Sequence, residues 1–564
     1  MIGFGRIGDV MTTGDGGVLA LADELLAAQL AAEPLGATLL GVPGYDDKLA
    51  DPSESAEQAL RAHALDIAER AEASVGAHDH DPVTAKVVAQ QARAMIDRID
   101  ARMIEYTVTD IFVGPAASLL TFLPMVALPD VERAQSYLSR LRAVPEHLDG
   151  VAERHRAGVA AGRTPVRRLV DAAVAHLDRY LTSPVATDPL LAQKLVGEDN
   201  GFAAERERVV SEIVRPAFAR YRAALADEIA PHGRADDRPG LCALPGGDAA
   251  YAALSRVHTT TDLTPEELHQ TGLDLIAALR EEYAELGARV FGTQDQTEIF
   301  QRLISDPDLR WRDGDELLEH ARAAIERAEA AAPGWFGRLP GQRCRVEPVP
   351  AAEAPGAPAA YYMPPSLDGL RPGVYYANTD RAHERDRFLA EVTAFHEAVP
   401  GHHFQLTLAM ELAELPLLRR LADVNAYVEG WGLYTERLAE EMGLYSDDVA
   451  RFGMLAMDSM RAGRLVVDTG LHAKGWSRDQ AVAYLRENTP LSVLEIGNEI
   501  DRYIAYPGQA LSYMVGRLEI QRIRAAAQAR LGDRFDIRAF HDLILGGGPL
   551  PLTVLDEVVA AWGN

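Results

Sequence analysis

Cysteine is nearly absent from the 564-residue sequence, which contains only Cys242 and Cys344. Two cysteines are too few for a disulfide framework or a cysteine-based zinc module, so we expect both to be buried packing residues in a reducing compartment. Basic residues are also in deficit, because 56 Lys and Arg stand against 84 Asp and Glu, a formal net charge of −28. A chain this acidic repels nucleic acid and anionic lipid, so neither a nucleic-acid nor a membrane partner is expected.

Long hydrophobic runs are missing as well. The longest apolar stretch, SLLTFLPMVALPDV from Ser118, is broken by Pro124 and Pro129 and is shorter than the roughly 20 residues of a spanning helix. The N-terminal text MIGFGRIGDVMTTGDGG has one Arg and no apolar run of signal-peptide length, with Met1 and Met11 both candidate starts. These features predict a soluble, cytoplasmic protein.

Strand-like text is scarce and helical text dominates. Apolar residues recur at spacings of three and four in segments such as VLALADELLAAQLAAE from Val18 and ELLEHARAAIERAEAA from Glu316. Thr264, followed by Pro265 and Glu267, has the order of a helix-starting capping box. Only residues 344–350 (CRVEPVP) and 373–379 (GVYYANT) resemble strands, and the Pro- and Gly-rich text between them reads as a loop. The sequence therefore predicts a mainly α fold with a small β-sheet.

The length favours two lobes, because one hydrophobic core stops growing well below 564 residues. A boundary within the segment PHGRADDRP, residues 231–239, divides the chain into a helical N-terminal lobe of residues 1–235 and a second lobe of residues 236–564. The second lobe contains an unusual histidine-rich motif.

That motif, TAFHEAVPGHHFQ at residues 393–405, resembles an interrupted zinc-binding helix. Zinc hydrolases commonly take two His from one helix at i and i+4, with a Glu after the first His acting as general base on water. His396 and Glu397 begin this pattern, but the next histidines are His402 and His403. On an ideal helix, residue i+6 lies roughly 120° from the required face. Since Pro400 breaks the helix, a bulge of two extra residues is expected to bring His402 into the second ligand position.

His403 remains the alternative second ligand. Adjacent side chains on a helix point in different directions, so we expect one of the two histidines to bind metal and the other to line the cleft or support the metal site. A third ligand is expected from the segment NAYVEGWGLYTERLAEEMGLY, residues 425–445. Glu429 lies among apolar and small residues, where a carboxylate without a partner is costly. In contrast, Glu436, Glu440 and Glu441 resemble an ordinary solvated face.

Four motifs together resemble one known family. HEAVPGHH, VEGWGLYTE, VDTGLHAKGWSRDQA and DRYIAYPGQALSYMVG are similar to the bacterial family called domain of unknown function 885, which is grouped with zinc metallopeptidases whose third ligand is a glutamate. The resemblance covers nearly the whole chain. It implies a Zn²⁺ cofactor, His396, His402 (or His403) and Glu429 as ligands, Glu397 as the base, and a two-lobed, metallopeptidase-like helical fold with the sheet near an active-site groove.

Further candidates come from the residues themselves. Asp468 and His472 are four apart, so on a helix the carboxylate can orient the imidazole for a catalytic role, although a helix-end hydrogen bond is the equal alternative. Tyr503, Tyr506 and Tyr513 are candidate donors to an oxyanion, although aromatic residues more often belong to the core. Candidate substrate-binding residues are Tyr375, Tyr376 and Asn378, by strand-edge pairing, together with Arg502 and Gln509.

These observations indicate a zinc-dependent hydrolase of amide bonds, a peptidase acting on short peptides. A hydrolase of non-peptide amides or esters is the alternative within enzymes, and a non-catalytic metal-binding or structural protein is the alternative outside them. Glu397 favours an enzyme, because metal binding alone does not need it. The expected partner is a small peptide or amide substrate, and the sequence indicates no oligomeric state.

Overall fold

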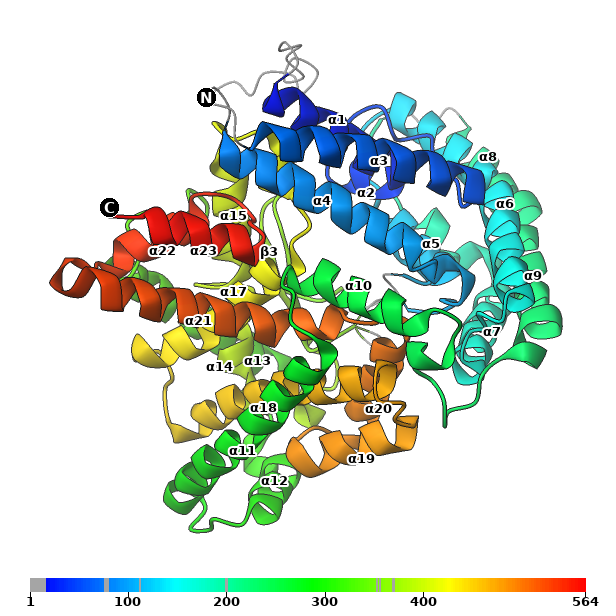
Figure 1. Ribbon diagram of the computed structural model, residues 1–564. Helices are drawn as coiled ribbons and strands as arrows, with labels where there is room; N and C mark the ends of the chain where they lie inside the picture. The colour runs from blue at the N-terminus through cyan, green and yellow to red at the C-terminus, as the bar shows by residue number, and fades with distance from the viewer. Residues whose placement is uncertain are drawn as a thin grey trace. The chain divides into compact units, whose positions relative to one another are not determined.

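The computed structural model describes residues 17–75, 81–110, 113–197, 201–350, 354, 357–367 and 371–563. The two candidate starts, Met1 and Met11, lie outside these ranges. The described residues are mainly helical and include one small three-stranded sheet (Figure 1). The predicted fold class is confirmed at this level.

The chain separates into two compact units. Unit 1 comprises residues 1–254, 471–479 and 501–507, and unit 2 comprises residues 255–470, 480–500 and 508–564. The segment around residue 235, expected to be a boundary, is instead held within unit 1. The backbone N–H of Arg234 donates to Pro165 O at 2.8 Å, and the backbone N–H of Arg167 donates to Arg234 O at 2.8 Å.

The described residues of unit 1 form helices and the segments that connect them, and include none of the three strands of the sheet. In α3 the buried residues Ala64, Ile67, Ala68 and Ala71 follow helical spacing, and this face packs against α4 (Figure 1). None of the chain's described helices has both the length and the apolar character needed to cross a membrane. The helices of this unit are α1 (Val18–Ala32), α2 (Pro34–Leu39), α3 (Glu54–Ser74), α4 (Pro82–Asp100), α5 (Pro115–Phe122), α6 (Val131–Ala160), α7 (Arg167–Thr182), α8 (Phe202–Val209), α9 (Arg215–Ala224) and most of α10 (Gly247–Thr259).

Unit 2 contains the sheet and most of the remaining helices. The predicted capping box is confirmed, because Thr264 Oγ1 accepts from the backbone N–H of Glu267, whose carboxylate accepts from the backbone N–H of Thr264. The helices are α11 (Pro265–Val290), α12 (Gln296–Ser305), α13 (Gly314–Ala331), α14 (Ala390–Glu397), α15 (His402–Glu411), α16 (Leu417–Leu421), α17 (Asn425–Glu441), α18 (Asp448–His472), α19 (Arg478–Asn488), α20 (Val493–Ala505), α21 (Ser512–Leu531), α22 (Ile537–Leu545) and α23 (Leu552–Ala561).

Helices α17 and α21 pack unusually closely. A Cβ atom added to Gly430 of α17 would lie 2.4 Å from the Cα of Gly516 on α21, and one added to Gly516 would lie 1.8 Å from Ala426 O. Only glycine permits this approach at either position. Helix α18 is joined to both through Asp458, which forms ion pairs with Arg437 of α17 and Arg517 of α21.

The sheet has the strand order β1-β3-β2, with β1 at Arg345–Pro348, β2 at Ala360–Met363 and β3 at Val374–Ala377. Strand β3 pairs with β1 in parallel and with β2 antiparallel. The two predicted strands are confirmed as β1 and β3. The prediction of an uninterrupted loop between them is wrong, because residues 360–363 form β2. Four residues with proline on both sides were too short a run to show strand periodicity.

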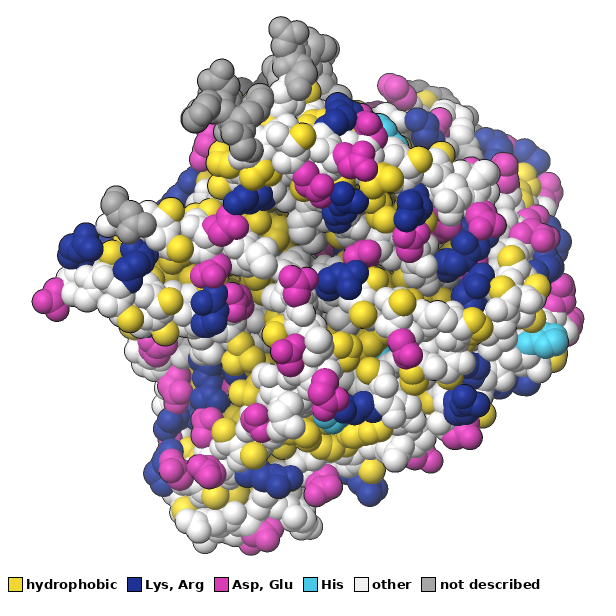
Figure 2. Space-filling model, in the orientation of Figure 1, with side chains coloured by type: hydrophobic (Ala, Val, Ile, Leu, Met, Phe, Trp, Pro, Cys, Tyr) yellow, Lys and Arg dark blue, Asp and Glu magenta, His cyan; other side chains and the backbone are white. Residues whose placement is uncertain are grey.

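Surface charge is mixed rather than segregated on one face of the molecule. On the face shown in Figure 2, acidic and basic side chains are interspersed among apolar ones. Cys242 and Cys344 are free thiols, as expected, but both are half-buried rather than buried.

Candidate metal centre

The helix carrying the histidine motif is broken completely instead of bulging. Helix α14 ends at Glu397 and α15 begins at His402, with a cis peptide bond between Val399 and Pro400. The indole Nε1–H of Trp431 donates to Pro400 O at 2.9 Å. The predicted bulge within one continuous helix is therefore wrong, but the break serves the purpose that the bulge was expected to serve, because it brings His402 back beside His396.

His396, His402 and Glu429 form a compact cluster. One potential ligand atom from each lies within 4.8 Å of the other two. Glu429 Oε2 is 3.6 Å from His396 Nε2 and 3.3 Å from His402 Nε2. Ligand atoms placed 2.0–2.1 Å from a tetrahedral zinc ion are about 3.4 Å apart, so the donor atoms and both distances fit a zinc site.

A second carboxylate orients His396. The Nδ1–H of His396 donates to Glu436 Oε1 at 2.7 Å, which leaves His396 Nε2 as the nitrogen that faces Glu429. Glu436 is completely buried, so its predicted place on a solvated face is wrong. The spacing along the helix could have indicated that Glu436 belongs to the site, because residue 436 is two turns beyond Glu429 and lies on the same face of α17. A Cβ at Gly432, between them, would lie 2.7 Å from the imidazole.

The cluster strongly favours positive charge. Burial opposes protonation of His396, but the carboxylates of Glu429 and Glu436 outweigh it and raise the pKa of His396 to about 9. Burial likewise acts to raise the pKa of Glu429, but hydrogen bonds from His396 and His402 hold the pKa of Glu429 well below its usual value. Electrostatics that stabilises a proton here also stabilises a divalent cation. No similar partner orients His402, whose buried Nδ1 has no hydrogen-bond partner in the described part of the chain.

The Glu436 hydrogen bond leads to a test. We expect Glu436→Gln to weaken zinc binding by about 10- to 100-fold, the usual effect of losing a carboxylate behind a ligating histidine. Competition with a chromogenic chelator measures the affinity. Glu440→Gln, which removes a carboxylate paired with Arg451 on the same helix, is the matched control and should bind zinc as the wild type does. Equal affinity in all three proteins would contradict the role given to Glu436.

Glu397 lies next to the cluster but outside it. Its side chain is half-buried, and its Oε2 accepts a hydrogen bond from the backbone N–H of Tyr362 at 3.1 Å. This contact holds the carboxylate against β2. Tyr362 was not predicted as a site residue, because it lies in the segment that was interpreted as a loop.

His403 faces away from the cluster. Its Nδ1 accepts from the Tyr362 hydroxyl at 2.9 Å, and its Nε2–H donates to Gln342 O at 2.9 Å. Both ring nitrogens are therefore engaged. The structure brings His402, and not His403, together with His396 and Glu429, and it makes His403 a support for β2.

The predicted pairing of Asp468 with His472 is wrong. The Nδ1 atom of His472 accepts from the backbone N–H of Leu241 at 3.1 Å, and its Nε2–H donates to Tyr503 O at 3.0 Å. Burial lowers the pKa of His472 to about 4, so the ring is neutral, and it stacks on Tyr251 within unit 1. Asp468, in unit 2, instead accepts from the backbone N–H of Gly508 at 3.1 Å. Neither side chain joins the cluster.

Tyr375, Tyr376 and Asn378 were predicted to bind substrate by pairing at a strand edge. That prediction is wrong, because both edges of their strand, β3, are already paired with β1 and β2. Tyr375 is 3% exposed, and the buried amide of Asn378 donates to Ala354 O and Ala357 O. Tyr376 is half-buried and stacks on Tyr361 with ring centroids 5.2 Å apart. These residues stabilise the sheet.

The remaining predicted residues run from the last turn of α20, which contains Arg502 and the buried Tyr503, to the first turn of α21. Tyr506 is half-buried and Gln509 is buried. The Arg502 guanidinium lies 5.2 Å from the centre of the Tyr503 ring. Tyr513, in the first turn of α21, lies beneath the guanidinium groups of Arg461 and Arg464.

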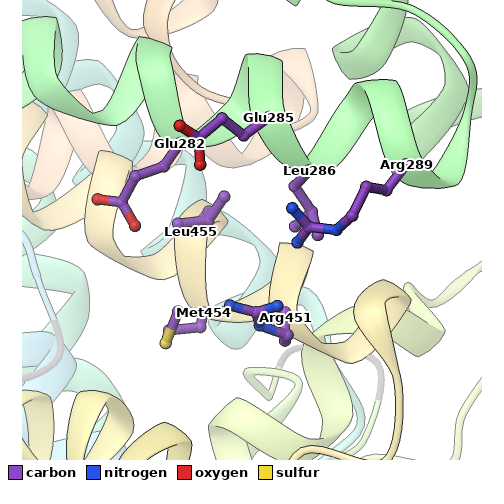
Figure 3. A pocket seen from close by; sticks show the side chains of 7 residues that line it. All are labelled: Glu282, Glu285, Leu286, Arg289, Arg451, Met454 and Leu455. Carbon is purple, nitrogen blue, oxygen red and sulfur yellow. The ribbon is translucent and has the colours of Figure 1, made fainter.

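A cavity elsewhere in unit 2 contains none of the predicted site residues. It measures about 210 Å³ and lies between α11 and α18 (Figure 3). Three of its four charged side chains are already paired, since Glu282 bonds Arg437, Arg289 bonds Asp448 and Arg451 bonds Glu440. The lining residues are Glu282, Glu285, Leu286, Arg289, Arg451, Met454 and Leu455.

Fold and site together describe a mainly helical protein with a two-histidine, one-glutamate cluster. The chain belongs to the family described as "Bacterial protein of unknown function (DUF885)", whose model matches residues 34–559. Comparison with curated proteins gave no match.

Two solved structures share the fold over nearly the full length of both chains. The first, described as "the putative lipoprotein from Colwellia psychrerythraea", has 28% sequence identity and a TM-score of 0.89, covering 97% of this chain and 99% of that one. The second, "a putative lipoprotein of unknown function from Shewanella oneidensis", has 17% identity and a TM-score of 0.73, covering 97% of this chain and 100% of the other.

Proposed function

We propose that the protein is a zinc-dependent hydrolase of amide bonds, a peptidase acting on short peptides. One observation supports this proposal: the potential metal ligands and the potential general base are different side chains at the same place. Three side chains converge with zinc-like spacing, while a fourth, Glu397, lies beside them, half-buried and outside the ligand set. A site built only to hold a metal has no need for that extra carboxylate.

The chain's own residues have distinct tasks in this reaction. Zinc, when bound, supplies a Lewis acid that polarises a carbonyl and acidifies water. Glu397 takes a proton from the attacking water and later passes it to the leaving amine. The backbone N–H of Tyr362 fixes the carboxylate in position, and His403 holds the Tyr362 side chain in turn. Glu436 keeps His396 in the tautomer whose Nε2 is free for the metal.

The outer edge of β2, with which no other strand of the described residues pairs, favours a peptide over other amides. Because the backbone N–H of Asn378 donates to Ala359 O, the register of β2 with β3 directs the backbone groups of Ala360 and Tyr362 away from β3. This outward edge meets Glu397 at Tyr362. An extended peptide is the ligand whose own backbone can pair with such an edge.

The predicted lobe arrangement, cellular location and alternative functions are also part of this proposal. The two-lobed, metallopeptidase-like arrangement rests on the resemblance alone. The cytoplasmic location stays a prediction, and the descriptions of the two similar structures give a reason to test it by fractionating cells that produce the protein. Hydrolysis of non-peptide amides or esters, and metal binding without turnover, remain the alternatives.

The test is a digest of a defined peptide mixture by the zinc-loaded protein, read by mass spectrometry. We expect new termini to appear, to be lost after chelation and to return when zinc is restored. The positions of the termini distinguish cleavage at chain ends from internal cleavage. If no peptide is cleaved but esters or small amides are, the first alternative replaces the peptidase, and if nothing is cleaved the non-catalytic alternative does.

A further inference from the structure

Arg461 of α18 is a buried cation without an anionic partner. It is 9% exposed, and within the described part of the chain no carboxylate lies within ion-pair distance of it. Its Nε is buried without a hydrogen-bond partner, and its Nη1 reaches only the sulfur atoms of Met457 and Met460. Thioether sulfur is a weak acceptor, so the Nε and Nη1 donors of Arg461 are left poorly satisfied. Keeping a charge in such a place is costly unless something else binds it.

Two acidic residues of this region, Asp458 and Glu499, are occupied by other arginines. Asp458, one turn earlier on α18, binds both Arg437 and Arg517. Glu499 binds Arg464, one turn later, at 2.8 Å. The neighbourhood therefore keeps an excess positive charge at Arg461.

The surroundings of Arg461 suit a ligand that enters from the surface. Met457, Met460 and Tyr513 are all half-buried, so the guanidinium lies just below accessible side chains. The Tyr513 ring lies 5.6 Å from the Arg461 guanidinium and 4.5 Å from that of Arg464. A guanidinium held against a ring keeps its fork of donors in a fixed direction, the geometry that binds a carboxylate through two hydrogen bonds.

The close packing of α17 and α21 connects this arginine to the candidate metal centre. Tyr513 is one helical turn from Gly516, which contacts Gly430, the residue after Glu429. The path from Tyr513 to Glu429 is on the order of 10 Å, given a rise of about 1.5 Å per helical residue and one close helix contact. An extended peptide of about three or four residues covers such a distance.

We propose that Arg461 binds a carboxylate of the substrate, so that the enzyme acts on short peptides that carry a free carboxylate at a fixed distance from the cleaved bond. This inference rests on the proposed function. The carboxylate can be the C-terminal group or an Asp or Glu side chain.

The test measures binding, so that it does not depend on turnover. Zinc-loaded Glu397→Gln protein is titrated calorimetrically with tetra-alanine, with tetra-alanine amide, and with Ala-Ala-Glu-Ala amide. We expect at least tenfold tighter binding of a peptide that has a carboxylate than of tetra-alanine amide. The peptide that gains affinity shows which kind of carboxylate is bound.

The variants locate the effect. Adding Arg461→Gln should abolish the discrimination, whereas Arg461→Lys, which keeps the positive charge, should retain part of it. Arg522→Gln is the matched control and should leave the discrimination unchanged, because it alters a half-exposed arginine of α21 that pairs with Glu519 and with Asp556 of α23.

The outcomes separate the two proposals. If the protein with Arg461 intact binds all three peptides equally or none of them, or if discrimination survives Arg461→Gln, the role of Arg461 is overturned. If carboxylates are preferred but the wild type cleaves no peptide, the anion site stands and the proposed peptidase function fails.

Discussion

Glu397→Gln is expected to bind zinc and fold like the wild type while hydrolysis falls by a hundredfold or more. The uncharged amide has the same shape but cannot accept a proton from water, and loss of a positioned general base costs on the order of 10²- to 10⁴-fold. Because Glu397 lies outside the cluster of potential ligands, its replacement should leave the metal in place. The rate is measured on the peptide that the wild type cleaves fastest, with zinc content and circular dichroism determined on the same preparation.

The informative control is Glu429→Gln, which should weaken zinc binding itself because it removes a charged ligand. The two variants must differ in kind, one losing turnover and the other losing metal. If Glu397→Gln cleaves as fast as the wild type in a zinc-dependent way, the general base has been assigned to the wrong residue.

His402→Ala is expected to lose most of the bound zinc, whereas His403→Ala should keep it. His402 Nε2 lies 3.3 Å from Glu429, while both nitrogens of His403 are hydrogen-bonded to Tyr362 and Gln342. Removing one of three ligands leaves too few donors for a stable catalytic zinc site. His403→Ala should lose only part of the activity, because it loosens β2 without touching the metal.

Zinc per chain, determined by mass spectrometry after dialysis, measures this difference. His541→Ala provides a further comparison, because it removes another buried histidine of unit 2 that is hydrogen-bonded to Tyr434 and to the backbone of Trp335. It should keep zinc. Loss of zinc from His403→Ala but not from His402→Ala would assign the second ligand to His403.

Local sequence was enough to predict the core of the candidate site. His396, Glu397 and His402 lie within seven consecutive residues, and Glu429 lies in a segment where a carboxylate needs a partner. The helical periodicity and the Thr264 capping box likewise depend on near neighbours in the chain. Such signals are visible without any knowledge of tertiary packing.

The missed features depend on contacts between distant segments. Glu436 is buried because the broken α14–α15 helix places His396 against α17, 40 residues further along the chain. Tyr362 acts through a backbone N–H, which no residue type reveals. His472 was misassigned because its partner Leu241 is separated from it by 231 residues, so the helical spacing to Asp468 was the only visible relationship.

Metal content is the most direct test of the central claim. The purified full-length protein is incubated with zinc, dialysed against metal-free buffer and analysed by inductively coupled plasma mass spectrometry, alongside a His396→Ala/His402→Ala variant. The account predicts about one zinc ion per wild-type chain, from the three-ligand set typical of catalytic sites, and almost none in the variant. A wild-type protein that retains no more zinc than the variant would contradict it.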